Sequence, residues 1–291
     1  RLRRQGEQAV RMRYRRRPDH GHASIRQRQP GQHAVPAEPL PCDAMMRQFG
    51  GEVGDDALLV SAAKGIENET LLLMSEVIED VLGPGVAGRC AYLSGPSFAR
   101  EVANELPTAV TVAAEDDEVA RAVQELFRTD YFRVYTIPDV VGVELGGALK
   151  NVIALAAGVS DGLGFGHNAR AALINRGLVE MARLGAAKGA QAETFAGLAG
   201  MGDLIATCMS KHSRNRHVGE QIGKGRKLRD VLAEMVMVAE GVATTKSVHD
   251  LAHKHSVELP IANEVYEVLF EDKDPILATS DLMTRQAKDE H

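Results

Sequence analysis

Cysteine, tryptophan and long hydrophobic runs are scarce or absent in this chain of 291 residues. It has three cysteines, no tryptophan and only 4% aromatic residues. Cys42, Cys90 and Cys208 are odd in number and far apart, which excludes a disulfide framework and a clustered cysteine metal site. No run approaches the roughly 20 apolar residues that a membrane helix needs, and no secretory signal is visible. These absences predict a reduced, cytoplasmic protein without membrane insertion.

Charge is unevenly distributed along the chain. The formal net charge is −6, yet residues 1–33 hold ten arginines and only two acidic residues, Glu7 and Asp19. A basic segment of this kind often binds nucleic acid. This one is rich in Arg, Gln, His, Pro and Gly and has no hydrophobic periodicity, which favours a disordered or non-native arm instead. We therefore expect no nucleic-acid partner.

Short apolar runs alternate with helical patterns from about residue 34 to 138. Strands are predicted in four places, over 57–63, 90–93, 108–113 and 132–136, and helices over 69–82 and 117–127. This alternation indicates an α/β layered domain. After Pro138 the strand signal ends, and helices are predicted over 141–159, 169–184 and 228–237. The sequence thus predicts an α/β domain over 34–138 and an all-α domain over 139–291.

A lysine stands within an otherwise apolar, small-residue segment, Gly146-Gly147-Ala148-Leu149-Lys150-Asn151-Val152. Burial would lower the pKa of this lysine towards neutrality, because the interior solvates an ammonium poorly. A lysine with such a pKa donates and accepts a proton near pH 7. The ordinary alternative, which the residue type alone favours, is a lysine that extends along a helix face to solvent.

Two further segments place polar groups at predicted helix starts. Gly200-Met201-Gly202-Asp203-Leu204 predicts a glycine loop that opens a helix, with Asp203 and Thr207 on one face. Taken alone, Asp203 is better explained as an N-cap. Ser213-Arg214-Asn215-Arg216 concentrates hydrogen-bond donors, and arginine binds phosphate through two parallel hydrogen bonds. A solvated basic patch is an equally good explanation of so short a run.

Polar loops follow two of the predicted strands. Lys64-Gly65 follows the first, and Ser94-Gly95-Pro96-Ser97 follows the second. Ligands of open α/β sheets bind outside the carboxyl ends of the strands, so together these loops predict a ligand crevice, although each alone is an ordinary turn. Val238-Ala239-Glu240-Gly241 is predicted to end a helix, with Glu240 solvated by default.

Histidines raise the question of a metal site. His249 and His253 have the i, i+4 spacing that can hold a metal, and His255 is close by. No glutamate follows the first histidine, as the zinc-protease pattern requires. We expect no metal there.

Seven segments together resemble the bacterial NAD(P)-dependent glycerol-3-phosphate dehydrogenases, in the order and spacing of that family. One such motif would be weak, but seven in order over about 250 residues are highly specific. Five of them are 63–67, 94–99, 146–152, 200–204 and 213–216, and the other two are 160–166 and 238–241.

The resemblance implies a Rossmann-type domain followed by an all-α substrate domain, usually in a homodimer. It implies reversible hydride transfer between NAD or NADP in reduced form and dihydroxyacetone phosphate, giving sn-glycerol 3-phosphate for phospholipid synthesis.

The resemblance also implies roles for individual residues. Lys150 is the proton donor to the substrate oxygen, and Lys64 and Asp203 hold and polarise that oxygen. The implied substrate-binding residues are Lys64, Gly95, Ser97, Lys150, Asn151, Asp203, Thr207, Ser213, Arg214 and Asn215, with Arg214 on the phosphate. The implied cofactor-binding residues are Lys64, Ala99, Arg214, Val238 and Glu240.

One departure from the family is large. The family begins with a strand and a G-x-G-x-x-G-type loop that holds the pyrophosphate at a helix N-terminus. No such motif precedes Lys64 here, and the family pattern resumes near Ala34. We therefore expect an incomplete Rossmann-type domain, from a truncated or frame-shifted start, and weak dinucleotide binding.

Two other functions stay open at this point. One is a catalytically impaired remnant of the same enzyme, or a basic-arm binding module built on its scaffold, and the missing glycine loop favours this alternative. The other is a β-hydroxyacid dehydrogenase, which shares the two-domain plan and a catalytic lysine but acts on a carboxylate. The choice between NADH and NADPH also stays open, because the segment that reads the 2′-position is absent.

Overall fold

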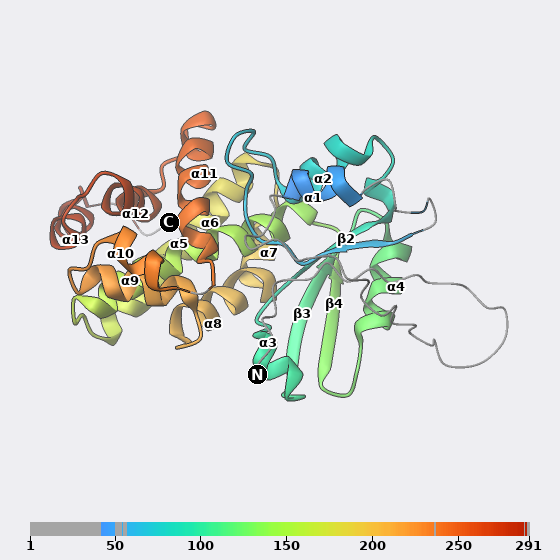
Figure 1. The fold of residues 1–291 in the computed structure, drawn as a ribbon, viewed down its shortest axis with the longest axis horizontal. Coiled ribbons are helices and arrows are strands. Elements are labelled where there is room, and N and C mark those ends of the chain that lie inside the picture. Colours follow the sequence, from blue (N-terminus) through green and yellow to red (C-terminus); the bar gives the residue numbers. More distant parts are fainter. Residues whose placement is uncertain (1–41, 50–53, 55–56, 236, 288, 290–291) are drawn as a thin grey trace.

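The computed structural model describes residues 42–49, 54, 57–235, 237–287 and 289. The predicted basic arm, residues 1–33, lies outside the described residues. Figure 1 shows a sheet with flanking helices on one side and a helical bundle on the other. The chain passes from one to the other where strand β4 (Phe132–Ile137) ends and helix α5 (Val140–Gly162) begins.

The sheet has four strands in the order β1-β2-β3-β4, where β1 is Leu59–Ser61, β2 is Cys90–Ser94 and β3 is Thr108–Ala113. Strands β1 and β2 are parallel, β2 and β3 are antiparallel, and β3 and β4 are parallel. The direction reverses after β2 because only the short helix α3 (Ala99–Ala103) joins it to β3. The parallel crossover from β3 to β4 runs through helix α4 (Asp117–Phe127).

Each face of the sheet is covered by a different element. On one face, Val110, Val112 and Val134 pack against Val119 and Val123 of α4. On the other face, Tyr92 and Ala113 pack in one buried cluster with Val140 and Val143 from the start of α5. Helix α5 thereby connects the sheet to the helical part of the chain.

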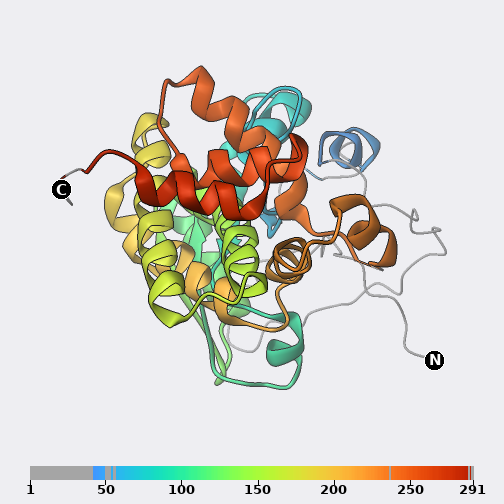
Figure 2. The ribbon, with the colours of Figure 1, turned by 90° about the vertical axis from the view of Figure 1, so that its left-hand side faces the viewer.

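Helix α5 is the central helix of the second part. Its 23 residues make it long and apolar enough to cross a membrane by length and composition, but 94% of that window is buried inside the protein. Figure 2 shows it surrounded by other helices. Its neighbours are α6 (His167–Ala187), α7 (Ala192–Ala196), α8 (Asp203–Met209), α9 (Arg214–Gly223), α11 (Glu240–Lys254) and α12 (Pro260–Phe270). Helix α10 (Leu228–Glu234) packs against α9, and α13 (Pro275–Thr284) packs against α12.

The remaining short elements lie beside the sheet and before α8. Helices α1 (Cys42–Phe49) and α2 (Met74–Leu82) pack against each other, and a 3₁₀ turn covers Ala87–Arg89. A π-helical turn, Leu198–Gly202, leads directly into α8.

Most predicted elements are confirmed, and four boundaries are wrong. The helix expected over 228–237 ends at Glu234, after which Met235 has extended backbone. The strand expected over 57–63 is only Leu59–Ser61. The helix expected from 69 begins at Met74, because Leu71 has a positive φ of 62° and Glu67 instead closes a turn onto Thr70. Val238–Gly241 begins helix α11 and does not end a helix.

Candidate active site

Lys150 is buried in the middle of α5, with 6% of its surface exposed. The small-residue face of α5 makes this burial possible, because no bulky side chain separates the lysine from α8. Its Nζ donates to Asp203 Oδ1 at 2.5 Å and to Thr207 Oγ1 at 3.1 Å. The lysine is therefore held inside the protein by partners on α8 and does not extend to solvent.

Asp203 bridges two lysines at the start of α8. Its second oxygen, Oδ2, accepts from Lys64 Nζ at 2.7 Å, and the carboxylate is 4% exposed. Lys64 follows strand β1, whereas Lys150 lies on α5, so the three charged groups come from distant parts of the sequence. The cluster thus lies beside the carboxyl end of β1 and joins the sheet to the helical part.

Burial and mutual charge shift the pKa values of this cluster. Burial, and next the nearby charge of Lys64, lower the pKa of Lys150, and with Asp203 opposing both the resulting pKa is about 8. Burial alone would raise the pKa of Asp203, but the charges of Lys64 and Lys150 hold it below its usual range. The cluster accordingly pairs a carboxylate whose pKa is lowered with a lysine whose pKa is about 8.

Thr207 lies one helical turn after Asp203 and shares its face, as the spacing predicts. Its hydroxyl lies 3.3 Å from Asp203 Oδ1 and also accepts from Lys150. The N-cap position of α8 belongs to Gly202, so Asp203 is not an N-cap. Its carboxylate serves the two lysines instead.

Asn151 and Asn215 connect the lysine helix to two other helix starts. The Asn215 amide donates to Asn151 Oδ1 at 2.9 Å, and its own Oδ1 accepts from the backbone N–H of Gly241 at 2.9 Å. Both asparagines are buried. The amide of Asn215 therefore ties α5, α9 and the start of α11 together next to Lys150.

The first turn of α9 also places Ser213 and Arg214. Ser213 caps the helix by accepting from the Arg216 backbone N–H at 3.2 Å. Arg214 is half-buried and donates to the Val238 carbonyl oxygen at 2.7 Å. Val238 is 51% exposed, and Glu240 begins α11 two residues later. Arg214 thus lies beside the segment expected to contact the cofactor.

The loop after β2 approaches the same region from the sheet. Gly95 has a φ of +132°, and a Cβ there would lie 3.0 Å from the Val110 Cα, so the position requires glycine. Ser97 donates within the loop to the Gly95 carbonyl oxygen at 3.1 Å. Ala99 begins α3 and is exposed. A Cβ on Gly202 would lie 3.7 Å from Pro96, which places this loop against the turn that carries Asp203.

Two models of one protein family match nearly all of the described chain. The N-terminal model of NAD-dependent glycerol-3-phosphate dehydrogenase matches residues 33–120, and the C-terminal model matches residues 139–280. The chain belongs to this family. It is 60% identical over 247 residues to glycerol-3-phosphate dehydrogenase [NAD(P)+] of Syntrophotalea carbinolica, covering 85% of this chain and 74% of the relative.

Further relatives agree with this assignment. The enzyme of the same name from Citrifermentans bemidjiense is 62% identical over 235 residues, which cover 81% of this chain and 70% of that one. The crystal structure of glycerol-3-phosphate dehydrogenase from Coxiella burnetii superposes with a TM-score of 0.80 at 39% identity, covering 84% of this chain and 74% of that one. The predicted fold class, a Rossmann-type domain followed by a helical domain, is confirmed.

Two polar residues of this dehydrogenase have no place among the predicted site residues. Ser94 and Glu144 line, with Lys64 and Gly147, a cavity of about 10 Å³, room for about one water molecule. The buried Ser94 hydroxyl has no hydrogen-bond partner among the residues that the structure describes, and burial raises the pKa of Glu144 to about 7. Glu144 carries the same sequence signal as Lys150, a charge within an apolar, small-residue helix.

The histidines on α11 are engaged with neighbours on α12. His249 stacks on Tyr266 with 3.8 Å between ring centroids, and its Nδ1 lies 2.9 Å from Asn263 Oδ1. Within the residues that the structure describes, no group of three His, Cys, Asp or Glu side chains could hold a metal ion.

Proposed function

We propose that this chain catalyses reversible hydride transfer between NAD(P)H and dihydroxyacetone phosphate, giving sn-glycerol 3-phosphate. Membership of the dehydrogenase family supports the reaction class. The observation that carries the proposal is the buried Lys150 amine, with a pKa lowered to about 8, held by Asp203 and Thr207. Such an amine exchanges a proton near neutral pH, which reduction of a carbonyl requires.

In this proposal Lys150 supplies the proton of the reaction. When bound, NAD(P)H supplies the hydride that adds to the carbonyl carbon. As the C=O bond opens, its electron pair moves to the oxygen, and the Lys150 ammonium transfers a proton there and becomes a neutral amine. Lys64 contributes a second positive charge, so two ammonium groups, both held by Asp203, face the developing alkoxide and stabilise it electrostatically. Solvent then returns a proton to Lys150.

The substrate phosphate is assigned to the start of α9. Arg214 provides a guanidinium, and the N-terminus of this ten-residue helix adds backbone N–H groups and a favourable dipole. Ser213 and Asn215 flank it. Gly95 and Ser97 approach the substrate from the sheet side, and Asn151 and Thr207 line the site beside Lys150.

The described residues fit part of a dinucleotide site. Ala99 and Val238 are exposed, Glu240 and Lys64 are half-buried, and Arg214 contacts the Val238 carbonyl oxygen. They are proposed to hold the nicotinamide end of NAD or NADP. No G-x-G-x-x-G motif precedes Lys64, so no residue is assigned to the pyrophosphate.

The finer biological context is likewise proposed. We assign residues 34–138 to the cofactor domain and 139–291 to the substrate domain, in a cytoplasmic homodimer that supplies a phospholipid precursor. Met201, Ile205 and Met209 are spaced one turn apart and are 39–57% exposed, which offers apolar surface for a second copy. Light scattering of the purified chain tests the dimer.

The proposal is tested by assaying the chain with NADH and NADPH against dihydroxyacetone phosphate and against a β-hydroxyacid. Turnover of the phosphorylated substrate alone supports the proposal, and turnover of the hydroxyacid alone would favour the second enzyme class. Calorimetric titration with both dinucleotides completes the test. Binding of sn-glycerol 3-phosphate without dinucleotide binding or turnover would identify a catalytically impaired member of the family.

A further inference from the structure

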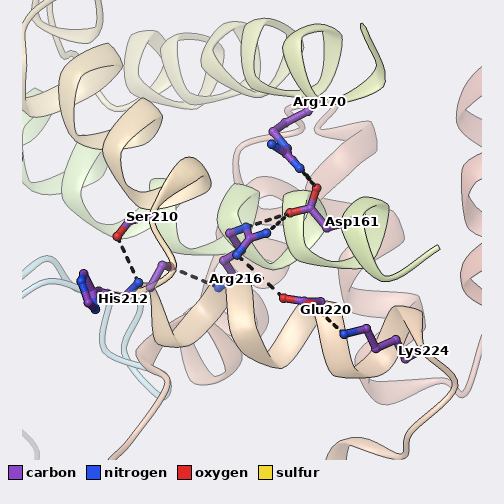
Figure 3. A network of polar contacts seen from close by, with 8 residues as sticks. Asp161, Arg170, Ser210, His212, Arg216, Glu220 and Lys224 are labelled. Carbon is purple, nitrogen blue, oxygen red and sulfur yellow. Dashed lines mark hydrogen bonds and ion pairs between the residues drawn. The ribbon is translucent and has the colours of Figure 1, made fainter. Parts of the chain in front are cut away.

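Asp161, near the end of α5, is the centre of a second buried ionic cluster (Figure 3). Its Oδ2 accepts from Arg216 of α9, with 2.7 Å to Nε and 2.6 Å to the terminal nitrogen. Its Oδ1 accepts from Arg170 of α6, with 2.9 Å to Nε. The side chains of Asp161, Arg216 and Arg170 are 7%, 15% and 21% exposed. One carboxylate therefore holds three helices together away from bulk solvent.

Helices α5 and α9 touch along their backbones through four glycines. A Cβ on Gly158 would lie 2.0 Å from the Arg216 carbonyl oxygen, and one on Gly219 would lie 2.0 Å from the Leu155 carbonyl oxygen. Gly162 and Gly223 are equally crowded, with 2.3 Å and 2.4 Å to carbonyl oxygens of the facing helix. Glycine faces allow this close approach but present no side chains that interlock. Val218 and Ile222 of α9 pack in one core cluster with Leu155 of α5, and polar links add fixed contacts that resist sliding of α9 along α5.

Two polar links join α9 to α5, and they start from the neighbouring residues Asn215 and Arg216. The Asn215–Asn151 hydrogen bond lies next to Lys150, and the Arg216–Asp161 ion pair lies about three turns further along α5. Arg216 is two residues after Arg214, so the two side chains project in nearly opposite directions from the helix. Arg216 faces α5, and Arg214 faces the Val238 segment.

We propose that Arg216 and Asp161 are positioning residues for the substrate phosphate, because they fix the register of α9 and so hold Arg214 and Asn215 at a set distance from Lys150. This inference rests on the proposed function. Arg216 and Asp161 act in this proposal without touching the substrate. A shift of about 1 Å in a binding group can cost on the order of 100-fold in rate, so small slippage of α9 matters.

The test compares Arg216→Gln with Arg170→Gln. Both variants remove one guanidinium from Asp161, but only the first releases α9, so Arg170→Gln is the matched control. Arg216→Gln should raise the KM for dihydroxyacetone phosphate by about tenfold or more. The KM for unphosphorylated dihydroxyacetone should change much less. Arg170→Gln should leave the ratio of the two KM values near that of the wild type, and Arg216→Lys should restore part of it.

Hydrogen exchange provides a readout that does not depend on turnover. Backbone amides of residues 216–223 should exchange faster in Arg216→Gln than in Arg170→Gln when both are folded. A ratio of KM values that is unchanged in Arg216→Gln would overturn the proposal, as would equal exchange in the two variants. If the wild-type chain turns over neither substrate, the proposed function fails, and the exchange comparison still decides whether Arg216 fixes α9.

Discussion

Helix α5 carries two buried clusters of similar design, in each of which one carboxylate lies between two cations. Asp203 lies between Lys64 and Lys150, and Asp161 on α5 itself lies between Arg170 and Arg216. The clusters differ in the type of cation. Burial brings the pKa of Lys150 down to about 8, whereas guanidinium groups keep their proton in proteins.

Because of this difference, the lysine cluster can transfer a proton, whereas the arginine cluster can only stabilise the packing of helices. The lysine cluster lies where the carboxyl end of β1 meets the start of α8, so it borders the predicted ligand crevice. The arginine cluster joins α5, α6 and α9 behind that site. Chemistry and positioning are thus assigned to two ionic clusters about three turns apart on one helix.

Replacement of Lys150 should have the largest effect, because it removes the group that transfers the proton. Lys150→Ala should lower kcat by about 10²–10⁴-fold, the usual contribution of a general acid. Lys150→Arg should also lose most of the rate, because a guanidinium keeps charge but does not release its proton. Steady-state kinetics and a circular dichroism melt measure rate and folding. A near wild-type rate in either folded variant would contradict the role of Lys150.

Replacement of Asp161 should act on stability. Asp161→Ala leaves the mostly buried guanidinium of Arg170 without its carboxylate and leaves that of Arg216 only Glu220 at 3.8 Å, and breaking a buried ion pair costs about 3–5 kcal/mol. The effect should be near the lower limit, since both arginines keep some exposure. Urea denaturation measures it. Asp272→Ala, which removes an exposed pair with Lys227, is the control and should cost at most about 1 kcal/mol.

If Asp161→Ala destabilises the protein no more than Asp272→Ala does, the second cluster has no structural role. That result would contradict the claim that the arginine cluster stabilises the packing of α5, α6 and α9.

Replacement of Arg214 separates phosphate binding from chemistry. Arg214→Ala should raise the KM for the phosphorylated substrate far more than for dihydroxyacetone, since hydrogen bonds to charged groups contribute roughly 1.5–3 kcal/mol. Kinetics with both substrates measure the effect. Arg226→Ala, which removes a surface pair with Glu234, is the control. Equal increases for both substrates would show that Arg214 does not bind the phosphate.

The lowered pKa of Lys150 also predicts a small dependence of stability on pH. Between about pH 8 and 10.5 the unfolded chain keeps the Lys150 proton while the folded chain has lost it, so stability rises with pH in this window. The slope is at most about 1.4 kcal/mol per pH unit. The difference in unfolding free energy between the wild type and Lys150→Met isolates this contribution. A difference that stays constant across the window would contradict the shifted pKa.

Local patterns in the sequence predict much of this molecule and miss its long-range contacts. The strands over 90–93, 108–113 and 132–136 follow from apolar runs, and their observed bounds differ by no more than one residue. The start of α2 was missed because Glu67 and Leu71 form a turn that periodicity does not reveal.

The site shows the same division. The shared face of Asp203 and Thr207 follows from their spacing, whereas the residue type alone favours an exposed Lys150 and the structure buries it. The bridge from Lys64 to Asp203 spans 139 positions, and no local pattern encodes it. Arg216 and Asp161 lie within motifs that were recognised, but their pairing depends on how closely four glycines let α5 and α9 approach.

The pH profile of kcat for reduction of dihydroxyacetone phosphate tests the central claim most directly. Lys150 must be protonated to donate, so the rate should be level below about pH 8 and fall by about tenfold per pH unit above it. Oxidation of sn-glycerol 3-phosphate needs the neutral amine and should show the opposite trend, rising towards pH 8. A reduction rate that stays constant from about pH 7 to 10 would show that Lys150 is not the proton donor.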